Sequence, residues 1–167
     1  WPDQMYDLGL RFAFGVGPCR RGNHTLRTRS GNCMQCEPAN IAFANRHYAE
    51  GFVYLAYSLE KILIKVGIAK DISAGISSLN SLGYAGASDW KILQSIEVPG
   101  AGEIEFAIHA DLATHNAAET YLRDGNPVVC REVFRCDMHT ALLAFNAHTG
   151  ERREVDQEIS QQFLEHL

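Results

Sequence analysis

Residues 51–79, GFVYLAYSLEKILIKVGIAKDISAGISSL, constrain the fold of this chain more than any other segment. Gly51–Tyr57 and Ile62–Ile68 are rich in β-branched and aromatic residues and alternate as half-buried strands do. Asp71 is a good N-cap, and the apolar residues after it trace one face of a helix that Gly83 would end. The segment therefore predicts a β-hairpin that leads directly into a helix.

The rest of the chain predicts a few further elements around this unit. The pattern indicates strands at Trp90–Val98 and Val128–Cys136, helices at Glu103–Asn116 and Met138–His148, and a loop at Tyr121–Pro127. This order predicts a small α/β (α+β) fold with a three-stranded antiparallel sheet flanked by helices. We expect three regions: residues 1–48 with a linker helix, a domain over 49–149, and a peripheral helix or tail over 150–167.

The length and composition exclude several classes of protein. A chain of 167 residues is long enough for one compact domain with an appendage. No segment approaches the roughly 18 apolar residues of a membrane span, and the N-terminus lacks the pattern of a signal peptide. The expectation is a cytoplasmic protein without a membrane partner.

The charge is unevenly distributed. The net charge is −5, yet residues 1–50 hold six arginines against four acidic residues, and residues 51–167 hold nine basic against sixteen acidic. Such a local excess of arginine favours contact with nucleic-acid phosphates, and a solvated loop is the alternative. The four arginines of the cluster are Arg20, Arg21, Arg27 and Arg29.

Four metal-ligand side chains occur within this basic segment, CRRGNHTLRTRSGNCMQC. Cys19, His24, Cys33 and Cys36 have the spacing C-x4-H-x8-C-x2-C. Zinc favours four tetrahedral thiolate or imidazole ligands, and a set of four leaves no open position for catalysis. With few apolar residues, the segment needs a metal to hold its shape. We therefore expect a structural zinc knuckle, with redox or chance thiols as the alternative.

The remaining two cysteines and a nearby histidine are not needed for this ligand set. The odd cysteine count of five argues against a disulfide scaffold. Cys130 and Cys136 are expected to fill core positions of a strand. His47 is an alternative zinc ligand, although it lies beyond the knuckle in the expected linker helix.

Several short motifs of the second region occur in a recognisable order. GFVYL contains the pair Val53–Tyr54, KVG ends at Gly67, EIEFAIHADL contains Glu105, and REVFRC contains Glu132 and Phe134. On these motifs, residues 51 to about 145 resemble the GIY-YIG endonuclease superfamily, most closely its phage and restriction-type branch. The N-terminal cluster resembles the small Cys-His knuckles attached to such nucleases.

The resemblance implies roles for individual residues in phosphodiester hydrolysis. Tyr54 would be the general base, and Lys65, where the family more often has tyrosine, would assist it or contact the phosphate. Glu105 would hold one divalent metal, Mg2+ or Mn2+, with Glu103 as the less favoured register. His109 lies one helical turn after Glu105 and could reach the same site.

Each of these residues could also have a purely structural role. Tyr54 could be a packed aromatic residue, and Lys65 a solvated strand residue. Glu105 could be an exposed helix acid, and His109 its i,i+4 partner. Glu132 is expected to be structural. Tyr57 and Tyr84 are expected to be core or edge aromatic residues, although either could face the cleft.

Gly75 stands where the resemblance leads us to expect an arginine. It lies eight residues after Gly67. At this position the resemblance implies an arginine that makes bidentate hydrogen bonds to the scissile phosphate. A glycine inside a helix costs roughly 1 kcal/mol relative to alanine. The glycine indicates either an engineered inactivation or a natural pseudo-nuclease. We favour the first, because Tyr54, Lys65 and Glu105 remain.

The sequence therefore predicts a metal-dependent DNA endonuclease of GIY-YIG type that is catalytically impaired. Its arginines would position duplex DNA, favoured over single strands, through the backbone. Cleavage of both strands would need a homodimer or sequential nicks. The alternatives are a non-catalytic DNA-binding or regulatory module on the same fold, and a zinc-stabilised protein-interaction domain.

Overall fold

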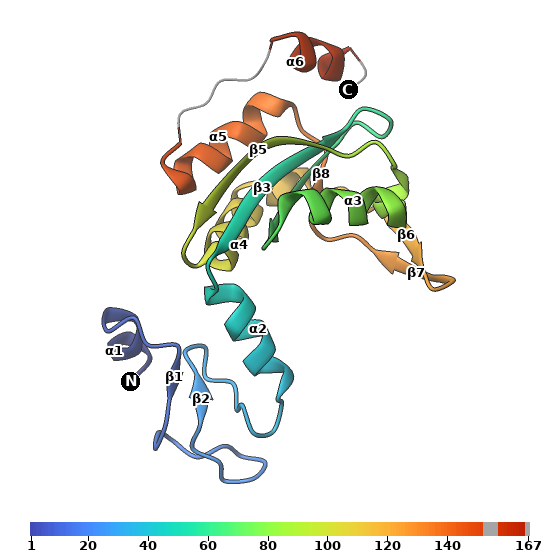
Figure 1. The fold of residues 1–167 in the computed structure, drawn as a ribbon. Helices are drawn as coiled ribbons and strands as arrows, with labels where there is room; N and C mark the ends of the chain where they lie inside the picture. Colours follow the sequence, from blue (N-terminus) through green and yellow to red (C-terminus); the bar gives the residue numbers. More distant parts are fainter. Residues whose placement is uncertain (152–156, 166–167) are drawn as a thin grey trace. The chain divides into compact units, whose positions relative to one another are not determined.

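The computed structural model describes residues 1–151 and 157–165, and the chain forms two compact units, Trp1–Ala49 and Glu50–Leu167 (Figure 1). Each unit is considered by itself below. Part of the tail predicted as a peripheral helix, residues 152–156 and 166–167, lies outside the described residues. Within the described part, the tail contains helix α6, Gln157–Leu164.

The N-terminal unit contains little regular structure. Its elements are α1 (Pro2–Asp7), the short antiparallel strands β1 (Phe12–Ala13) and β2 (Arg27–Thr28), and α2 (Ala39–Tyr48). Few of its described apolar residues are buried: Met5, Cys19, Met34 and Ala44. Because so small an apolar core contributes little stability, the unit depends on other interactions to hold its shape.

The second unit is built on a four-stranded antiparallel sheet with the strand order β5-β3-β4-β8. The expected mixed α/β (α+β) fold with an antiparallel sheet flanked by helices is confirmed, and this sheet has four strands where three were expected. The additional strand is short because only two of its residues pair with β4, and it places buried Val133 beside Lys65. The strands are β3 (Gly51–Ser58), β4 (Leu63–Ala69), β5 (Lys91–Val98) and β8 (Val133–Phe134).

The hairpin and the helix expected from residues 51–83 are confirmed. β3 pairs with β4 in register from Phe52–Ala69 to Ser58–Leu63. The Asp71 side chain accepts a hydrogen bond from the Ala74 N–H and caps α3, Ile72–Leu82. Gly83 ends the helix in the left-handed conformation, as its position predicted.

Helices cover both faces of the sheet. On one face, α3 and the short 3-10 helix η1 (Tyr84–Gly86) pack over Tyr54, Ala56 and Leu63. On the other face, α4 (Ala101–Asp111) and α5 (Met138–Thr149) pack over Val53, Leu55 and Val66, and α6 adds buried Phe163. Alternate residues of β3 and β4 thus serve two separate cores, as the pleat of a strand requires.

Two expectations about residues 103–136 need correction. α4 begins at Ala101 and ends at Asp111, and the 3-10 helix η2 (Ala113–His115) follows, so the helix predicted over Glu103–Asn116 is shorter and starts earlier. The predicted loop Tyr121–Pro127 is a hairpin of β6 (Thr120–Arg123) and β7 (Asn126–Val129). Val128 and Val129 belong to this hairpin, which is why the strand predicted over Val128–Cys136 shrinks to β8.

The signal that identifies this hairpin is the dipeptide Asp124–Gly125 between its strands. Both residues have positive φ, 52° and 78°. An Asp-Gly pair is a favoured two-residue connection of this kind, since such turns require positive φ at both positions.

In the described part of the chain, no helix is both long enough and apolar enough to span a membrane.

Candidate functional site

Tyr54 lies on the α3 face of the sheet, directly across from Gly67 in the β3–β4 register. Its ring covers Gly67 closely: a β-carbon at residue 67 would lie 2.7 Å from both the hydroxyl oxygen and Cζ of Tyr54. Atoms at this distance overlap, so the tyrosine keeps its position because residue 67 has no side chain. Glycine at this strand position is explained by the ring above it.

Lys65 is buried on the same face, only 3% exposed. Its Nζ lies 2.5 Å from Oε2 of Glu132 and 3.3 Å from the carbonyl oxygen of Val66. The ammonium also lies 4.9 Å from the centre of the Tyr84 ring. An ion pair, a carbonyl and an aromatic face together stabilise the buried charge, which would otherwise be costly. Lys65 is therefore not the solvated strand residue that the sequence left open.

Glu132 reaches this lysine from the residue immediately before β8. Its own carbonyl accepts a hydrogen bond from the Val66 N–H, which fixes the backbone beside β4. The expectation that Glu132 is structural agrees with this pairing. The pairing also makes Glu132 the counter-ion of a buried candidate site residue, separated from it by 67 positions in the chain, which the sequence did not reveal.

His109 belongs to the same group of polar residues. Its Nε2 lies 3.4 Å from the Val66 carbonyl oxygen that Lys65 also contacts, and its ring packs against Phe134 with the centroids 5.3 Å apart. Burial lowers the pKa of His109 below its ordinary value of 6.5, and the positive charge of Lys65 acts in the same direction, while the Val66 carbonyl and Glu132 oppose the shift. His109 thus favours the neutral form.

Two residues that the sequence did not assign to a site complete this group. Burial, and next the negative charge of Glu132, raise the pKa of Tyr84 well above its ordinary range. Burial also raises the pKa of the Cys130 thiol, against a hydrogen bond with Tyr84 that lowers it. Tyr84 is neutral at ordinary pH and presents its ring to Lys65. We call Lys65, Tyr84, His109, Cys130 and Glu132 the lysine cluster.

The two candidate metal carboxylates of α4 differ in their surroundings. Glu105 is half-buried one turn before His109, whereas Glu103 is exposed in the first turn of the helix. Oε2 of Glu103 lies close to Gly100, where an added β-carbon would meet it at 3.1 Å. Glu103 is thus held at the start of the helix, where a negative charge is favourable.

Gly75 lies in the first turns of α3, and nothing in the backbone requires a glycine there. Its N–H donates to the Asp71 carbonyl as in any helix, and it is not one of the glycines with positive φ. An added β-carbon would lie 3.4 Å from Cβ of Ala69, at the tight end of ordinary contact. The position can therefore hold a side chain with little or no adjustment.

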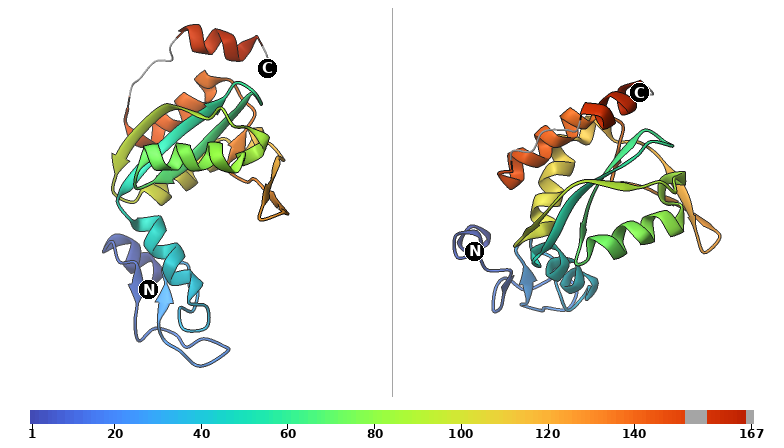
Figure 2. Two further views of the ribbon diagram at one scale, coloured as in Figure 1. Left: turned by 45° about the vertical axis from the view of Figure 1, so that its right-hand side comes forward. Right: turned by 45° about the horizontal axis from the view of Figure 1, so that its top comes forward.

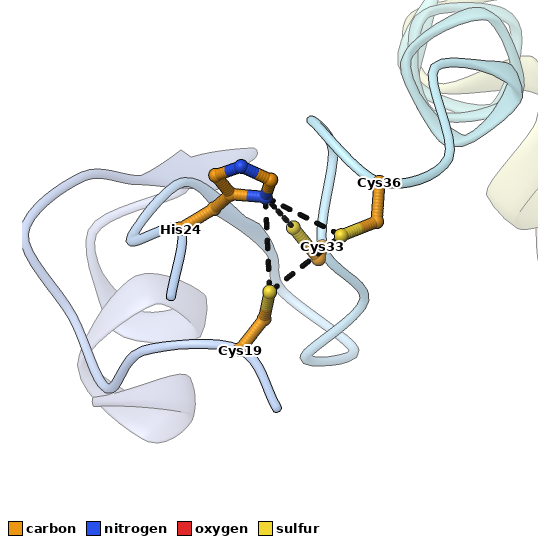
Figure 3. A group of neighbouring side chains, drawn as sticks. All are labelled: Cys19, His24, Cys33 and Cys36. Atoms are coloured by element: carbon orange, nitrogen blue, oxygen red, sulfur yellow. Dashed lines mark hydrogen bonds between the residues drawn. The ribbon is translucent and has the colours of Figure 1, made fainter. Parts of the chain in front are cut away.

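The four expected zinc ligands come together in the N-terminal unit (Figure 3). Nδ1 of His24 lies 3.7, 3.6 and 3.3 Å from the sulfurs of Cys19, Cys33 and Cys36, and the sulfurs of Cys19 and Cys36 are 3.6 Å apart. Four donors around one tetrahedral zinc ion would be separated by roughly 3.5–3.8 Å. The cluster can therefore hold a zinc ion, with His24 binding through Nδ1.

Gly22 shapes the cluster in two ways. Its N–H donates to Sγ of Cys19 at 3.2 Å, and this hydrogen bond is the main cause that lowers the pKa of Cys19 to about 5. Cys36, hydrogen-bonded to Cys19, has its pKa raised to about 11. A β-carbon at residue 22 would lie 2.5 Å from Cε1 of His24, so the histidine ring needs a glycine there.

The arginines of this unit fall into two groups. Arg27 donates to the carbonyls of Gly17 and Gly31, while Arg29 donates to Leu10 and lies over the Tyr48 ring, 5.0 Å from its centre. These contacts hold the unit together. Arg20 and Arg21 are exposed, and Arg21 is 3.9 Å from Glu37 at the surface. Together with Arg27 they line an open pocket of about 400 Å³ beside the zinc ligands.

The other residues considered from the sequence lie outside the Cys-His group. His47 packs between Phe43 and Tyr48 on α2. Cys136 is buried, and burial raises the pKa of its thiol to about 12, as expected for a core cysteine. Among the described residues, the Cys-His group is the one set of three or more metal-ligand side chains whose donor atoms lie close enough to share an ion.

Comparison with known proteins identifies a matching domain family. The family model described as the T5orf172 domain matches residues 51–149, which include the sheet, α3, α4, α5 and the whole lysine cluster. No curated protein and no solved structure matches the chain.

Proposed function

This chain belongs to the T5orf172 domain family, and we propose that it is a DNA endonuclease of GIY-YIG type, impaired at residue 75. The domain is found in phage and nuclease-like proteins, which supports a nuclease or DNA-related role. The observation that carries the finer proposal is the ammonium of Lys65, which is buried on the same face of the sheet as Tyr54, two positions before the Gly67 that faces Tyr54, and is held there by Glu132. Buried, charge-paired groups of this kind are typical of sites that stabilise an anionic transition state.

In this proposal the chain's own residues divide the chemistry. The Tyr54 phenol first releases its proton to solvent, and the resulting phenolate oxygen then accepts a proton from the attacking water. Because Lys65 already has Glu132, the Val66 carbonyl and the Tyr84 ring as partners, it acts through its positive potential and not by direct contact with phosphate. Neutral His109 orients this group through the Val66 carbonyl. Since Tyr54 is only 4% exposed, DNA binding must uncover its hydroxyl.

We further propose that Glu105 holds a divalent cation. A single half-buried carboxylate, completed by waters and phosphate oxygens, is a donor set that suits Mg2+ or Mn2+. Such an ion supplies a Lewis acid at the phosphate and lowers the pKa of a water. Both glutamates lie on α4. Glu105 is favoured because it is half-buried and lies one turn before His109, whereas Glu103 is exposed in the first turn of the helix.

Gly75 explains why we propose impaired cleavage. Two N–H donors of an arginine in α3 could contact a phosphate at once, and glycine offers none. Since the backbone at residue 75 is helical and has room for a β-carbon, the absence of arginine does not follow from the fold. Both an engineered and a natural loss are compatible with this geometry.

The N-terminal unit would position the DNA. Arg20 and Arg21 are the exposed members of the arginine group, so we propose that they contact the phosphate backbone of a duplex, with Arg27 beside them in the pocket wall. Arg29 would support them indirectly through Tyr48 and Leu10. The zinc ion would be structural, since all four ligand positions are filled by protein.

The experiment is to install arginine at residue 75 and assay cleavage of duplex DNA with Mg2+ or Mn2+. Gly75→Arg should cut, and the second change Tyr54→Phe or Glu105→Ala should abolish cutting. Gly75→Lys restores the charge without the planar fork and should cut far less, while Gly75→Ala controls for helix stability. Added guanidinium ion should partly rescue the unmodified chain, as it can occupy the space of the absent side chain.

Gly75 also favours a second candidate, a non-catalytic DNA-binding module on the same fold. In that case all variants would bind duplex DNA in a salt-dependent way and none would cut. Absence of DNA binding in every variant would contradict both candidates and favour a zinc-stabilised protein-interaction domain. Measuring mass at working concentration would show whether the cutting species is a homodimer or a single chain that nicks twice.

A further inference from the structure

The β6–β7 hairpin stands apart from the rest of the second unit. Its two strands form a sheet of their own, joined by the tight turn at Asp124–Gly125. Figure 2 shows the hairpin projecting from the main sheet with its turn outermost. A two-stranded hairpin is marginally stable by itself, so one that projects in this way needs anchoring at its base.

The base of the hairpin is anchored to the lysine cluster. The Tyr121 ring packs on the Tyr84 ring with the centroids 5.0 Å apart, and Tyr84 in turn lies under the ammonium of Lys65. The Cys130 N–H donates to the Glu119 carbonyl and closes the ladder below the strands. The hairpin is therefore in direct contact with the lysine cluster, through Tyr121 and Tyr84.

The register assigns the side chains of the hairpin to two faces. Tyr121 pairs with Val128, and both are half-buried against the body of the unit. Two positions further along the same face, Arg123 lies opposite Asn126 at the tip, and both are exposed. The other face carries exposed apolar side chains, with Leu122 66% and Val129 60% exposed. The Arg123–Asn126 pair and the exposed apolar face are therefore not needed to pack the hairpin against the unit.

The dimensions and chemistry of the hairpin fit a DNA groove. Paired strands lie about 4.8 Å apart, and the major groove of B-DNA, about 12 Å wide, admits a two-stranded ribbon. Arginine and asparagine make bidentate hydrogen bonds to guanine and adenine, and apolar side chains contact the thymine methyl group. Residues 51–167 hold more acidic than basic side chains. Within this acidic region, exposed Arg123 at the tip and exposed Arg131 near the base supply local positive charge that complements the DNA phosphates.

We propose that the β6–β7 hairpin enters the major groove of duplex DNA and that Arg123 and Asn126 determine sequence preference there. The proposal rests on the proposed DNA-directed function and adds its means of recognition. Asp124 occupies a positive-φ position of the turn and could accept a hydrogen bond from cytosine.

The test is selection from a pool of duplexes with randomised sequence, using the unmodified chain, which is expected to bind without cutting. Arg123→Ala and Asn126→Ala should each weaken binding to the selected sequence by about tenfold to a hundredfold and relax preference at one or two base pairs. Lys91→Ala, which removes one exposed positive charge from β5 and leaves the hairpin intact, is the matched control and should leave the sequence preference unchanged. The turn residues stay unchanged, and thermal unfolding of each variant confirms that the fold is retained.

The outcomes separate this inference from the proposed function. If the unmodified chain binds DNA while the Arg123→Ala, Asn126→Ala double variant keeps its affinity within about twofold and its sequence preference, the hairpin proposal is wrong and the nuclease proposal stands. The same holds if Gly75→Arg cuts the same sequences with or without the double change. Equal binding to double-stranded RNA of the selected sequence would also overturn it, because the deep, narrow RNA major groove excludes a ribbon. No DNA binding at all overturns both proposals.

Discussion

The phenol ring of Tyr54 lies over the α-carbon of Gly67, so close that a β-carbon at residue 67 would be 2.7 Å from the tyrosine hydroxyl oxygen. The two residues face each other across the β3–β4 hairpin. The candidate general base and the glycine of the second motif are therefore one structural unit, and a change in either should affect both the fold and the site.

Gly67→Ala should destabilise the second unit by about 1–3 kcal/mol, because the tyrosine ring has to move within a packed core. The measurement is the free energy of unfolding from denaturant titration. The combination Gly67→Ala with Tyr54→Ala should lose less than the sum of the two single changes, since the clash is absent. Strict additivity would show that the ring does not constrain residue 67.

Gly75→Ala should have the opposite sign and stabilise the chain by up to about 1 kcal/mol. The backbone at residue 75 is helical, and the new methyl group would lie 3.4 Å from Ala69. The same denaturant titration measures it. A loss of stability would contradict the inference that residue 75 has room for a β-carbon beside Ala69.

Glu132→Gln should destabilise the chain by about 1–3 kcal/mol, because it leaves the buried ammonium of Lys65 without its counter-ion. The value lies at the lower end for buried ion pairs since the Glu132 side chain is 37% exposed and solvent screens part of the effect. The double variant with Lys65→Met should recover most of the loss, which a double-mutant cycle of unfolding free energies would measure. Without recovery, the two charges are not coupled.

Removal of zinc should unfold the N-terminal unit and leave the second unit folded. Zinc content should be one ion per chain and fall in Cys33→Ser but not in Cys130→Ser. Gly22→Ala should also weaken zinc binding, because its methyl group would meet the His24 ring at 2.5 Å, whereas Gly17→Ala has nothing within 4 Å and serves as the matched control. Equal zinc affinity of these two alanine variants would contradict the arrangement of the cluster.

The burial of His109 predicts a pH dependence of stability. Its pKa is lowered in the folded chain, so the unfolded chain binds the proton more readily, and the contribution of His109 to stability falls as pH decreases below about 6.5. Glu132 and Lys65 face this ring and act in opposite directions. The slope of unfolding free energy against pH between 7 and 5 should be smaller in His109→Phe. An unchanged slope would show that other groups cause the dependence.

The local elements follow from the amino-acid sequence. β-branched alternation, the Asp71 cap and the Gly83 stop predict β3, β4 and α3, since these signals act over a few neighbouring residues. Ligand spacing likewise predicts the Cys-His cluster, because all four ligands lie within one short loop region. The β6–β7 hairpin is also within reach of the sequence, because Asp124–Gly125 is a two-residue turn signal that the expectation of a longer loop did not use.

The assembly of the candidate site depends on tertiary packing. Lys65 and Glu132 are 67 positions apart, and β8 brings them together by pairing at just two positions. The sequence places Lys65 on a strand but gives no sign that its charge is buried, since burial depends on what η1, α4 and β8 bring over that strand. Propensity and spacing act along the chain, whereas the partner of a buried charge is selected by packing between elements that are distant in sequence.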